Sequence, residues 1–539
     1  MAIVHAQGAA MVRADSSSER ALHPPSPPMP VGVSTTRNIL SNLLGNIAYA
    51  ITGFILAPIM IDGLGDLHYG MWALALSLVG SYGLIDTGMR ITMQRFVARF
   101  KGMNQRESLN QVLATTLVLM VAASLLLCAL TAFLILFIPS FFHVAVSSQP
   151  LFRRVLALLG LSVAFIFPTR ALTTYLSGIQ RFDLFNFGST LTSLTKAILI
   201  IAALHSGFGL LGVAAVTLTI EALALPFYWL LIKRADPDAS LHWRDVQVRR
   251  IRELASFSFF AYLGNAGDYL RFSMDSAVIS RFLGVTLVTP FSVAGRLMDN
   301  FRALIATFNS PLMPRMTEID TQGRAADLGE MFVRTTRMTA LISFFIASLV
   351  VLDGKSLLRL WLGERFVSSY GLLLVLTFGH VLLLAQAPSG SLMFAKGRHR
   401  LLGWWTLGEG AVNLFLSIFW ARRYGLVGVA LGTTVPMLVT GVFIQPRYVS
   451  RLLNLPLAHY IRGAFLKPLF ACGLFLLISS LVFSGQDQVR ISSAALILAC
   501  QCTLFAFLAY AAGLNTTERQ LARQQWRDAL IVFRRLRTN

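Results

Sequence analysis

Charged side chains lie inside several long apolar stretches of this 539-residue sequence. At bilayer depth such groups are costly unless they pair or line a wet cavity. Asp268, Arg271 and Asp275 are spaced i, i+3, i+7, which places them on one face of a helix. A second set follows at 296–302. Arginine binds phosphate oxygens through a planar, bidentate fork, so these arginines are candidates for binding an anionic headgroup. The alternative is that neighbouring carboxylates neutralise them and fasten helices together.

The remaining candidates are more scattered. Lys196 and Glu221 have no partner four residues away, so each needs one from another helix, and they are able to pair with each other. The predicted cationic cavity contains Arg271, Arg296, Arg302 and Arg90. Polar or proton-coupling candidates are Asn46, Asn265, Asp268, Asp275, Asp299, Glu221, Glu409 and His380.

Motifs for other chemistry are missing from the sequence. It contains no Walker loop, no dinucleotide-binding fingerprint and no H-E-x-x-H motif. Its four cysteines, Cys128, Cys472, Cys500 and Cys502, have neither recurring spacing nor histidine partners, so they predict no disulfide framework and no zinc site. We therefore expect no cofactor, no metal and no enzymatic activity. If the chain transports a substrate, the energy would come from an ion gradient, the membrane potential or consumption of the substrate on the far side.

The composition is that of a chain solvated mainly by lipid. Apolar residues make up 55% and charged residues 13%, with a mean hydropathy of +0.65. We expect an all-α polytopic membrane protein with about fourteen spans of about 20 residues each. The approximate limits are 38–60, 69–90, 111–138, 152–176, 185–205, 209–232, 255–280, 288–311, 335–353, 369–392, 402–420, 425–445, 463–484 and 491–513. The loops between them are too short for a catalytic domain.

The net charge of +21 reflects orientation in the membrane rather than binding to nucleic acid. With a cytoplasmic N-terminus, the inside segments hold about 28 Lys and Arg and the outside segments about nine, so both termini are predicted to be cytoplasmic. Residues 1–37 are predicted to be a disordered tail and 233–254 a basic linker. Residues 515–539 predict a basic amphipathic helix with a capping box at Thr517 and Gln520, either held to anionic lipid or docking a partner enzyme.

The sequence also repeats at a nearly constant offset of about 219 residues. Leu44-Gly45-Asn46 recurs as Leu263-Gly264-Asn265, and GLLGVA at 209–214 recurs as GLVGVA at 425–430. Each copy holds six spans, an even number, so the copies enter the membrane in the same sense. This predicts two six-helix lobes, 38–232 and 255–446, related by a parallel repeat around a cleft, with 463–513 adding two C-terminal helices.

Residues 38–102 carry a family resemblance. The matched features are Asn46, Pro58, Leu64-Gly65, Tyr69-Gly70, Trp72, Leu84-Ile85-Asp86-Thr87-Gly88 and Arg95. Together with GIQRFDLFN at 178–186 and with 209–214, they resemble the bacterial polysaccharide and O-antigen flippases of the multidrug/oligosaccharidyl-lipid/polysaccharide exporter superfamily. Such proteins have a cationic cavity formed by spans 1, 2, 7 and 8. The sequence departs from that pattern in span 1, which has no basic residue after Arg37.

The resemblance implies a flippase in surface polysaccharide biosynthesis. It would move an undecaprenyl-diphosphate-linked oligosaccharide from the cytoplasmic to the periplasmic leaflet of the bacterial inner membrane by alternating access. Its partners would be this lipid-linked oligosaccharide, membrane lipids and a polysaccharide polymerase or glycosyltransferases, and we expect a monomer. The alternatives are a multidrug or cation antiporter of the same superfamily and, from another class, a membrane-embedded polymerase or glycosyltransferase.

Overall fold

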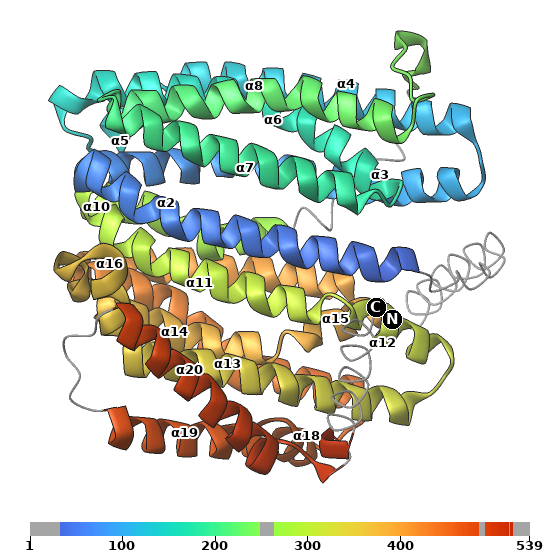
Figure 1. Ribbon diagram of the computed structural model, residues 1–539, viewed down its shortest axis with the longest axis vertical. Coiled ribbons are helices and arrows are strands. Elements are labelled where there is room, and N and C mark those ends of the chain that lie inside the picture. Colours follow the sequence, from blue (N-terminus) through green and yellow to red (C-terminus); the bar gives the residue numbers. More distant parts are fainter. Residues whose placement is uncertain (1–32, 248–263, 484–490, 517, 521–539) are drawn as a thin grey trace, which may run out of the picture.

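The computed structural model describes residues 33–247, 264–483, 491–516 and 518–520, and their regular structure is entirely helical (Figure 1). The N-terminal half, 33–247, contains α2 (Val33–Gly80), α3 (Gly83–Gly102), α4 (Arg106–Leu134), α5 (Ile138–Phe141), α6 (Gln149–Gly178), α7 (Phe182–His205) and α8 (Gly209–Ala235). The C-terminal half, 264–452, contains a helical segment at 264–272, α10 (Asp275–Phe282), α11 (Val288–Asn309), α12 (Leu312–Thr321), α13 (Ala325–Leu362), α14 (Tyr370–Ala385), α15 (Pro388–Ala395), α16 (His399–Val439) and α17 (Gln445–Leu452). A C-terminal addition contains α18 (Leu457–Ile461), a π-helical turn at Arg462–Leu466, α19 (Lys467–Phe483), α20 (Ile491–Leu508) and a second π-helical turn at Ala509–Gly513.

Ten helices in the described ranges are long and apolar enough to cross a membrane. The chain is therefore an all-α polytopic membrane protein, as predicted. The count is lower than fourteen for two physical reasons. The predicted spans 38–60 and 69–90 are joined within the bent helix α2, which ends at Gly80, so the second span continues into α3. The predicted spans 402–420 and 425–445 are joined within the bent helix α16, which ends at Val439 and is followed directly by a π-helical turn. The predicted spans at 255–280 and 288–311 are interrupted or carry several charges, and 255–263 lies outside the described residues.

Two glycines bend these long helices. Gly65 in α2 has φ 74° and Gly425 in α16 has φ 60°, a left-handed conformation that costs glycine least. After Gly425 the chain returns along itself. Gly432 lies so close to Ser417 that a Cβ there would be 2.5 Å from the Ser417 backbone nitrogen. The two parts of α16 are thus packed against each other as a helical hairpin.

Left-handed turns recur between the two halves at spacings close to the sequence repeat. Ten of the twelve described residues with positive φ form five pairs, and the members of each pair are about 216 to 220 residues apart. The pairs are Gly65 and Gly284, Asn104 and Gly323, His143 and Gly363, Gln180 and Gly397, and Gly209 and Gly425. Their hydrogen bonding repeats as well. After Gln180 the Arg181 N–H donates to the Leu176 carbonyl, and after Gly397 the Arg398 N–H donates to the Met393 carbonyl.

The helix that crosses residues 264–282 is interrupted at Ser273 and Met274. An interruption at membrane depth frees backbone groups that must find partners inside the protein. The Ser77 hydroxyl of α2 donates to the Ser273 carbonyl at 2.6 Å, and the Tyr269 hydroxyl donates to the Ser77 carbonyl at 2.6 Å. The break is therefore held by the N-terminal half.

Outward-facing side chains are strongly apolar. Leu126 in α4 is 69% exposed and Leu481 in α19 is 73% exposed, and many other large apolar residues are similar. Contiguous apolar surface on this scale marks contact with lipid. The interior packs in separate clusters. One joins α3, α4, α6 and α8, and another joins α10, α11, α13, α14 and α16.

The C-terminal helix predicted over 515–539 is described only at its start. The Asn515 backbone N–H donates to the Glu518 carboxylate at 2.7 Å, and the Arg519 N–H donates to the Asn515 carbonyl. Asn515 and Glu518 therefore contribute to the helix start, while Thr517 of the predicted capping box lies outside the described residues. Asn515 precedes the first helical turn, so its backbone N–H is one of the groups that a side chain must satisfy. Residues 521–539 lie outside the described part.

Candidate functional site

A cavity of about 440 Å³ lies within the N-terminal half, between α2, α6, α7, α8 and the C-terminal half's α11. Its charged lining consists of Arg170, Lys196, Glu221 and Arg296. Hydroxyl groups supply much of the rest, from Thr52, Thr169, Thr173, Ser189, Thr192, Ser193 and Tyr228. Three cations, one carboxylate and many hydroxyls make a site suited to an anionic, oxygen-rich ligand.

Lys196 of α7 and Glu221 of α8 form an ion pair, with 2.5 Å between Nζ and Oε1. This is the pairing that the sequence suggested for two charges without a partner on their own helix. The side chains are 29% and 21% exposed, so they remain in contact with the cavity. The pair fastens α7 to α8 while keeping both charges at the cavity wall.

Arg296 reaches this cavity from the C-terminal half. Its guanidinium lies against Gly53 of α2, where even a Cβ would be 2.3 Å from Nη2. Among the residues that the structure describes, no carboxylate lies within 4.0 Å of Arg296. A larger residue at position 53 would displace the guanidinium, so glycine at this position allows Arg296 to reach the cavity. Arg296 and Glu221 are the predicted cavity residues that line this cavity.

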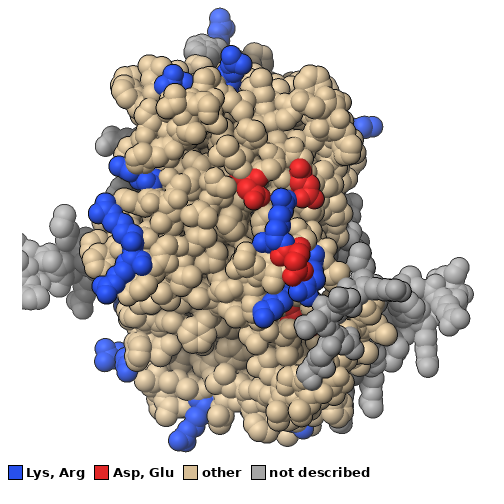
Figure 2. Space-filling view, turned by 90° about the vertical axis from the view of Figure 1, so that its left-hand side faces the viewer, with Lys and Arg blue, Asp and Glu red and all other residues tan. Residues whose placement is uncertain are grey.

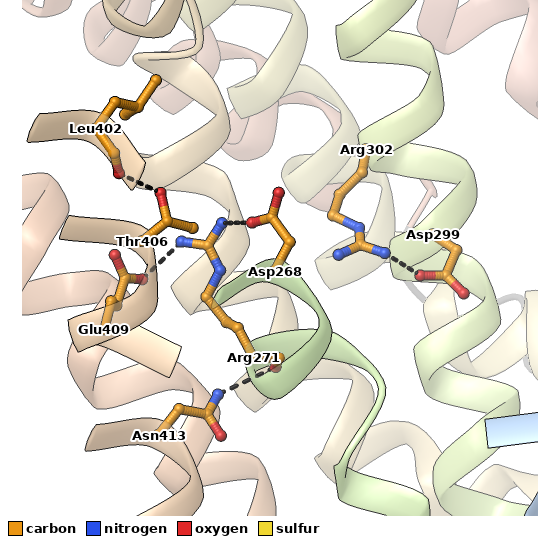
Figure 3. A network of polar contacts seen from close by, with 8 residues as sticks. All are labelled: Asp268, Arg271, Asp299, Arg302, Leu402, Thr406, Glu409 and Asn413. Carbon is orange, nitrogen blue, oxygen red and sulfur yellow. Dashed lines mark hydrogen bonds and ion pairs between the residues drawn. The ribbon is translucent and has the colours of Figure 1, made fainter. Parts of the chain in front are cut away.

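Arg271 lies in a different environment (Figure 3). One guanidinium nitrogen donates to Glu409 of α16 at 2.8 Å and another to Asp268 at 2.7 Å. The Asn413 amide donates to the Arg271 carbonyl at 3.1 Å. The Arg271 side chain is 11% exposed and that of Glu409 only 4%. The arginine is thus neutralised and buried, which agrees with the fastening role that the sequence left open.

Glycines make this network possible. A Cβ on Gly267 would lie 2.3 Å from the Thr406 backbone carbon, and one on Gly410 would lie 2.5 Å from the Gly267 carbonyl oxygen. Small residues allow two membrane helices to approach closely. The segment 264–272 and α16 are therefore in backbone contact, which brings Arg271 within reach of Glu409.

Arg302 is held beside this network rather than in the cavity. It donates to Asp299, one turn earlier on α11, at 2.6 Å (Figure 3). Its guanidinium lies 3.5 Å from the centre of the Phe272 ring. His380 of α14 packs against the same ring, with 5.5 Å between ring centres, and its Nδ1 lies 2.8 Å from the Leu376 carbonyl oxygen. Phe272 thus contacts both the histidine and the arginine.

The remaining predicted residues are dispersed. Asp275 is buried at the start of α10, where the Thr433 hydroxyl donates to its carboxylate at 3.2 Å. Arg90 is exposed on α3, and Asn265 is half-buried in the segment 264–272. Asn46 lies in α2, and its side chain is outside the description. Among the described residues, no group of three or more His, Cys, Asp or Glu is placed to hold a metal ion.

Of the four arginines predicted to share one cavity, Arg296 lines the cavity described above, Arg271 and Arg302 lie in and beside the network with Glu409, and Arg90 is exposed on α3. Arg296 and Arg302 are six residues apart on α11, which separates them by about 120° around the helix axis. They consequently face different neighbours. Arg170 and Lys196 also line the cavity, although the sequence analysis did not predict them as cavity residues. The available signal was a basic residue inside a long apolar stretch.

The two halves are joined by polar contacts near the bend of α2. Arg365 forms an ion pair with Asp62 at 2.7 Å, the Trp361 indole donates to the Phe54 carbonyl at 2.7 Å, and the Thr289 hydroxyl donates to the Asp66 carbonyl at 2.6 Å. Figure 2 views the end of the molecule at the left of Figure 1. It shows the acidic side chains of this face in one group together with some basic ones, while other basic side chains lie apart from them on a largely uncharged surface.

The fold and the buried charges define a multi-pass membrane protein, and solved structures share its fold. "Lipid II flippase MurJ, inward closed conformation" aligns with a TM-score of 0.67 and 12% identity, covering 88% of this chain and 98% of that chain. An inward-facing multidrug resistance MATE family transporter aligns with a TM-score of 0.63 and 16% identity, covering 77% and 99%.

The chain belongs to the polysaccharide biosynthesis protein family, whose model matches residues 64–370. It is 24% identical over 514 residues to "Uncharacterized membrane protein EpsK" of Bacillus subtilis (strain 168), covering 91% of this chain and 98% of the relative. It is 22% identical over 432 residues to "Putative O-antigen transporter" of Shigella flexneri, covering 77% and 98%. The resemblance found in the sequence is confirmed, and the chain is a transporter rather than an enzyme.

Proposed function

We propose that this protein moves an undecaprenyl-diphosphate-linked oligosaccharide from the cytoplasmic to the periplasmic leaflet of the bacterial inner membrane. The observation that carries the proposal is the cavity whose described lining includes the cations Arg170, Lys196 and Arg296, the carboxylate of Glu221 and several hydroxyl groups. A diphosphate is anionic and a sugar chain is rich in hydroxyls, so both find matching groups there. The Shigella flexneri relative's name points to the same class of cargo.

The proposed architecture has fourteen crossings. Six, from 38–232, form an N-terminal lobe and six, from 255–446, form a C-terminal lobe, while 463–513 adds two. The bends at Gly65 and Gly425 turn two long helices into four crossings, and the paired left-handed turns support a parallel repeat. A parallel repeat places a cleft between the lobes, where a site can be exposed to each side in turn.

The membrane makes such a cleft necessary. Transferring an unshielded diphosphate into hydrocarbon costs on the order of tens of kcal/mol by Born solvation, so the headgroup needs a wet cationic path. The polyprenyl tail can remain in lipid. With the cytoplasm negative, each negative charge moved outward gains about 2.3 kcal/mol per 100 mV, which favours export.

The cross-half contacts fit one state of an alternating-access cycle. Asp62, Trp361 and Arg365 join the halves toward the end where α2 bends. With cytoplasmic termini, this end is periplasmic, so its contacts close the outer side and leave the cargo to enter from the cytoplasm. Opening the outer side then requires these contacts to separate.

The charge of the cavity also distinguishes cargoes. A multidrug or cation antiporter with this fold needs an acidic site, whereas three cations face one carboxylate here. A lipid-linked oligosaccharide suits the site better. A polysaccharide polymerase or glycosyltransferase would then act as a partner before or after the transport step.

The test is flipping in proteoliposomes that carry a fluorescent undecaprenyl-diphosphate-linked oligosaccharide, with translocation read as headgroup protection from an external reagent. Losing a charged hydrogen-bonding group from the site costs about 1.5 to 3 kcal/mol, so Arg296→Ala should slow flipping about tenfold or more. Arg296→Lys should retain part of the rate. Arg154→Ala removes an exposed arginine of α6 that does not line the cavity and should leave the rate unchanged. Normal flipping by Arg296→Ala would refute the site.

A further inference from the structure

A second cavity, of about 400 Å³, lies in a different part of the molecule. It is formed where α13 meets the segment 458–467 and the chain that follows α20. Four basic side chains line it together with one amide: Arg337, His459, Arg462, Lys467 and Asn515. No residue of this cavity lines the one in the N-terminal half.

The cavity lies at the edge of the apolar part of three helices. Arg337 directly precedes the uncharged stretch 338–352 of α13, and Lys467 directly precedes the uncharged stretch 468–483. Asn515 directly follows the uncharged stretch 491–514. In a membrane, the transition from uncharged to basic residues falls at the level of the lipid headgroups. All three helices thus reach that level at this cavity.

The cations of the cavity are only partly neutralised. Arg337 and Glu518 form a buried ion pair at 2.6 Å, and the Arg337 Nε donates to the Gly463 carbonyl. Lys467 donates to the Asn515 amide oxygen at 2.5 Å, which is a neutral acceptor. Within the described residues, no carboxylate lies within 4.0 Å of Arg462 or Lys467. These two positive charges are available to an anion.

The surface beside the cavity is apolar and exposed. Leu466 is 61% exposed, Leu469 is 54% exposed and Phe470 is 64% exposed, and they follow Arg462 along the same helix. Basic groups at headgroup level beside an apolar helix face match the two parts of a phospholipid. We propose that this cavity binds the phosphate of an anionic membrane lipid through Arg462 and Lys467, with the acyl chains lying along α19.

The experiment measures lipid retention by the full-length protein. The protein is incorporated into nanodiscs of dioleoylphosphatidylcholine with a minor fraction of dioleoylphosphatidylglycerol. It is then extracted, and bound phosphatidylglycerol is counted by native mass spectrometry. Each basic residue near a lipid phosphate strengthens binding about fivefold, so Arg462→Ala or Lys467→Ala should weaken retention by about that factor and the double variant about thirtyfold. Arg337 is left intact because its buried pair with Glu518 holds the fold.

Two comparisons make the result decisive. Arg451→Ala removes an exposed arginine of α17 outside the cavity and should retain the lipid as the wild type does. Equal retention by the wild type and the double variant overturns the proposal, as does an equal loss in Arg451→Ala. Millimolar inorganic phosphate is added in a third arm. If it displaces the lipid completely from the wild type, the site binds a soluble phosphate and the lipid assignment is wrong.

Discussion

Among the described residues, the cavity of the N-terminal half has more positive than negative side chains, and the charge cluster of the C-terminal half has more negative than positive ones. Among the described residues that line the cavity, the charged ones are Arg170, Lys196, Arg296 and Glu221. In the cluster, two arginines meet three carboxylates: Arg271 and Arg302 with Asp268, Asp299 and Glu409. The spacing of charges along single helices suggests equal numbers of positive and negative side chains, and neither set has equal numbers.

Hydration explains the difference. The Glu409 side chain is 4% exposed, and a charge buried so deeply must be matched by a partner at close range. Around the cavity, water and hydroxyl groups solvate the charges, so an excess of one sign is tolerated. The contribution of an intramembrane arginine is therefore decided by its neighbours and its access to water. Its residue type alone does not separate a cargo contact from a structural one.

The largest effect is expected from breaking the cluster at its most buried carboxylate. Glu409→Ala leaves Arg271 buried with Asp268 as its remaining carboxylate, and removing one partner of a buried pair costs about 3 to 5 kcal/mol. The measurement is thermal unfolding in detergent. Asp268→Ala serves as the matched variant because its side chain is 52% exposed, and it should cost less than about 1 kcal/mol. Similar losses in both variants would contradict the contrast in burial.

A smaller effect is expected for the ion pair at the cavity wall. Lys196→Met and Glu221→Gln should each cost about 1 to 2 kcal/mol, and the double variant should cost less than their sum. Water in the cavity moderates the penalty, since the side chains are 29% and 21% exposed. A double-mutant cycle on unfolding, run beside flipping assays, measures the coupling. Strict additivity would mean that the pair does not join α7 to α8.

The smallest effect is expected at the exposed edge of the cluster. Asp299→Asn removes the carboxylate that accepts from Arg302, but the Asp299 side chain is 56% exposed. Exposed pairs contribute about 0 to 1 kcal/mol, so unfolding should shift little. The result is compared with that of Glu409→Ala in the same detergent. A loss as large as that of Glu409→Ala would show that Arg302 depends on Asp299 as strongly as Arg271 does on Glu409.

Much of the fold followed from the sequence, because hydrophobicity and the repeat are encoded in residue types. The predicted boundaries near Gly65 and Gly425 coincide with the bends, since only a short turn separates the flanking apolar stretches. The interruption at Ser273 and Met274 was not predictable in this way. No proline or glycine marks it, and its carbonyl is satisfied by Ser77, about 196 residues away in the chain.

The site was harder to predict for a geometric reason. Charges in apolar stretches could be found, but the direction in which each side chain points depends on helix rotation and on neighbours far away in sequence. The absence of a side chain at Gly53 leaves room for the Arg296 guanidinium. Gly267 and Gly410 allow their helices to approach closely, so that Glu409 contacts Arg271. These glycines look ordinary in the sequence. Their effect on the charges emerges only from helix packing.

The paired left-handed turns have a consequence for protein engineering. At three of the pairs, one copy uses glycine where the other uses a residue with a side chain: Gly323 for Asn104, Gly363 for His143 and Gly397 for Gln180. Left-handed backbone costs a non-glycine residue about 1 to 2 kcal/mol. The C-terminal copy therefore indicates which residues of the N-terminal copy can be replaced by glycine. Of these substitutions, we expect Gln180→Gly to relieve the most backbone strain with the least loss of side-chain contact.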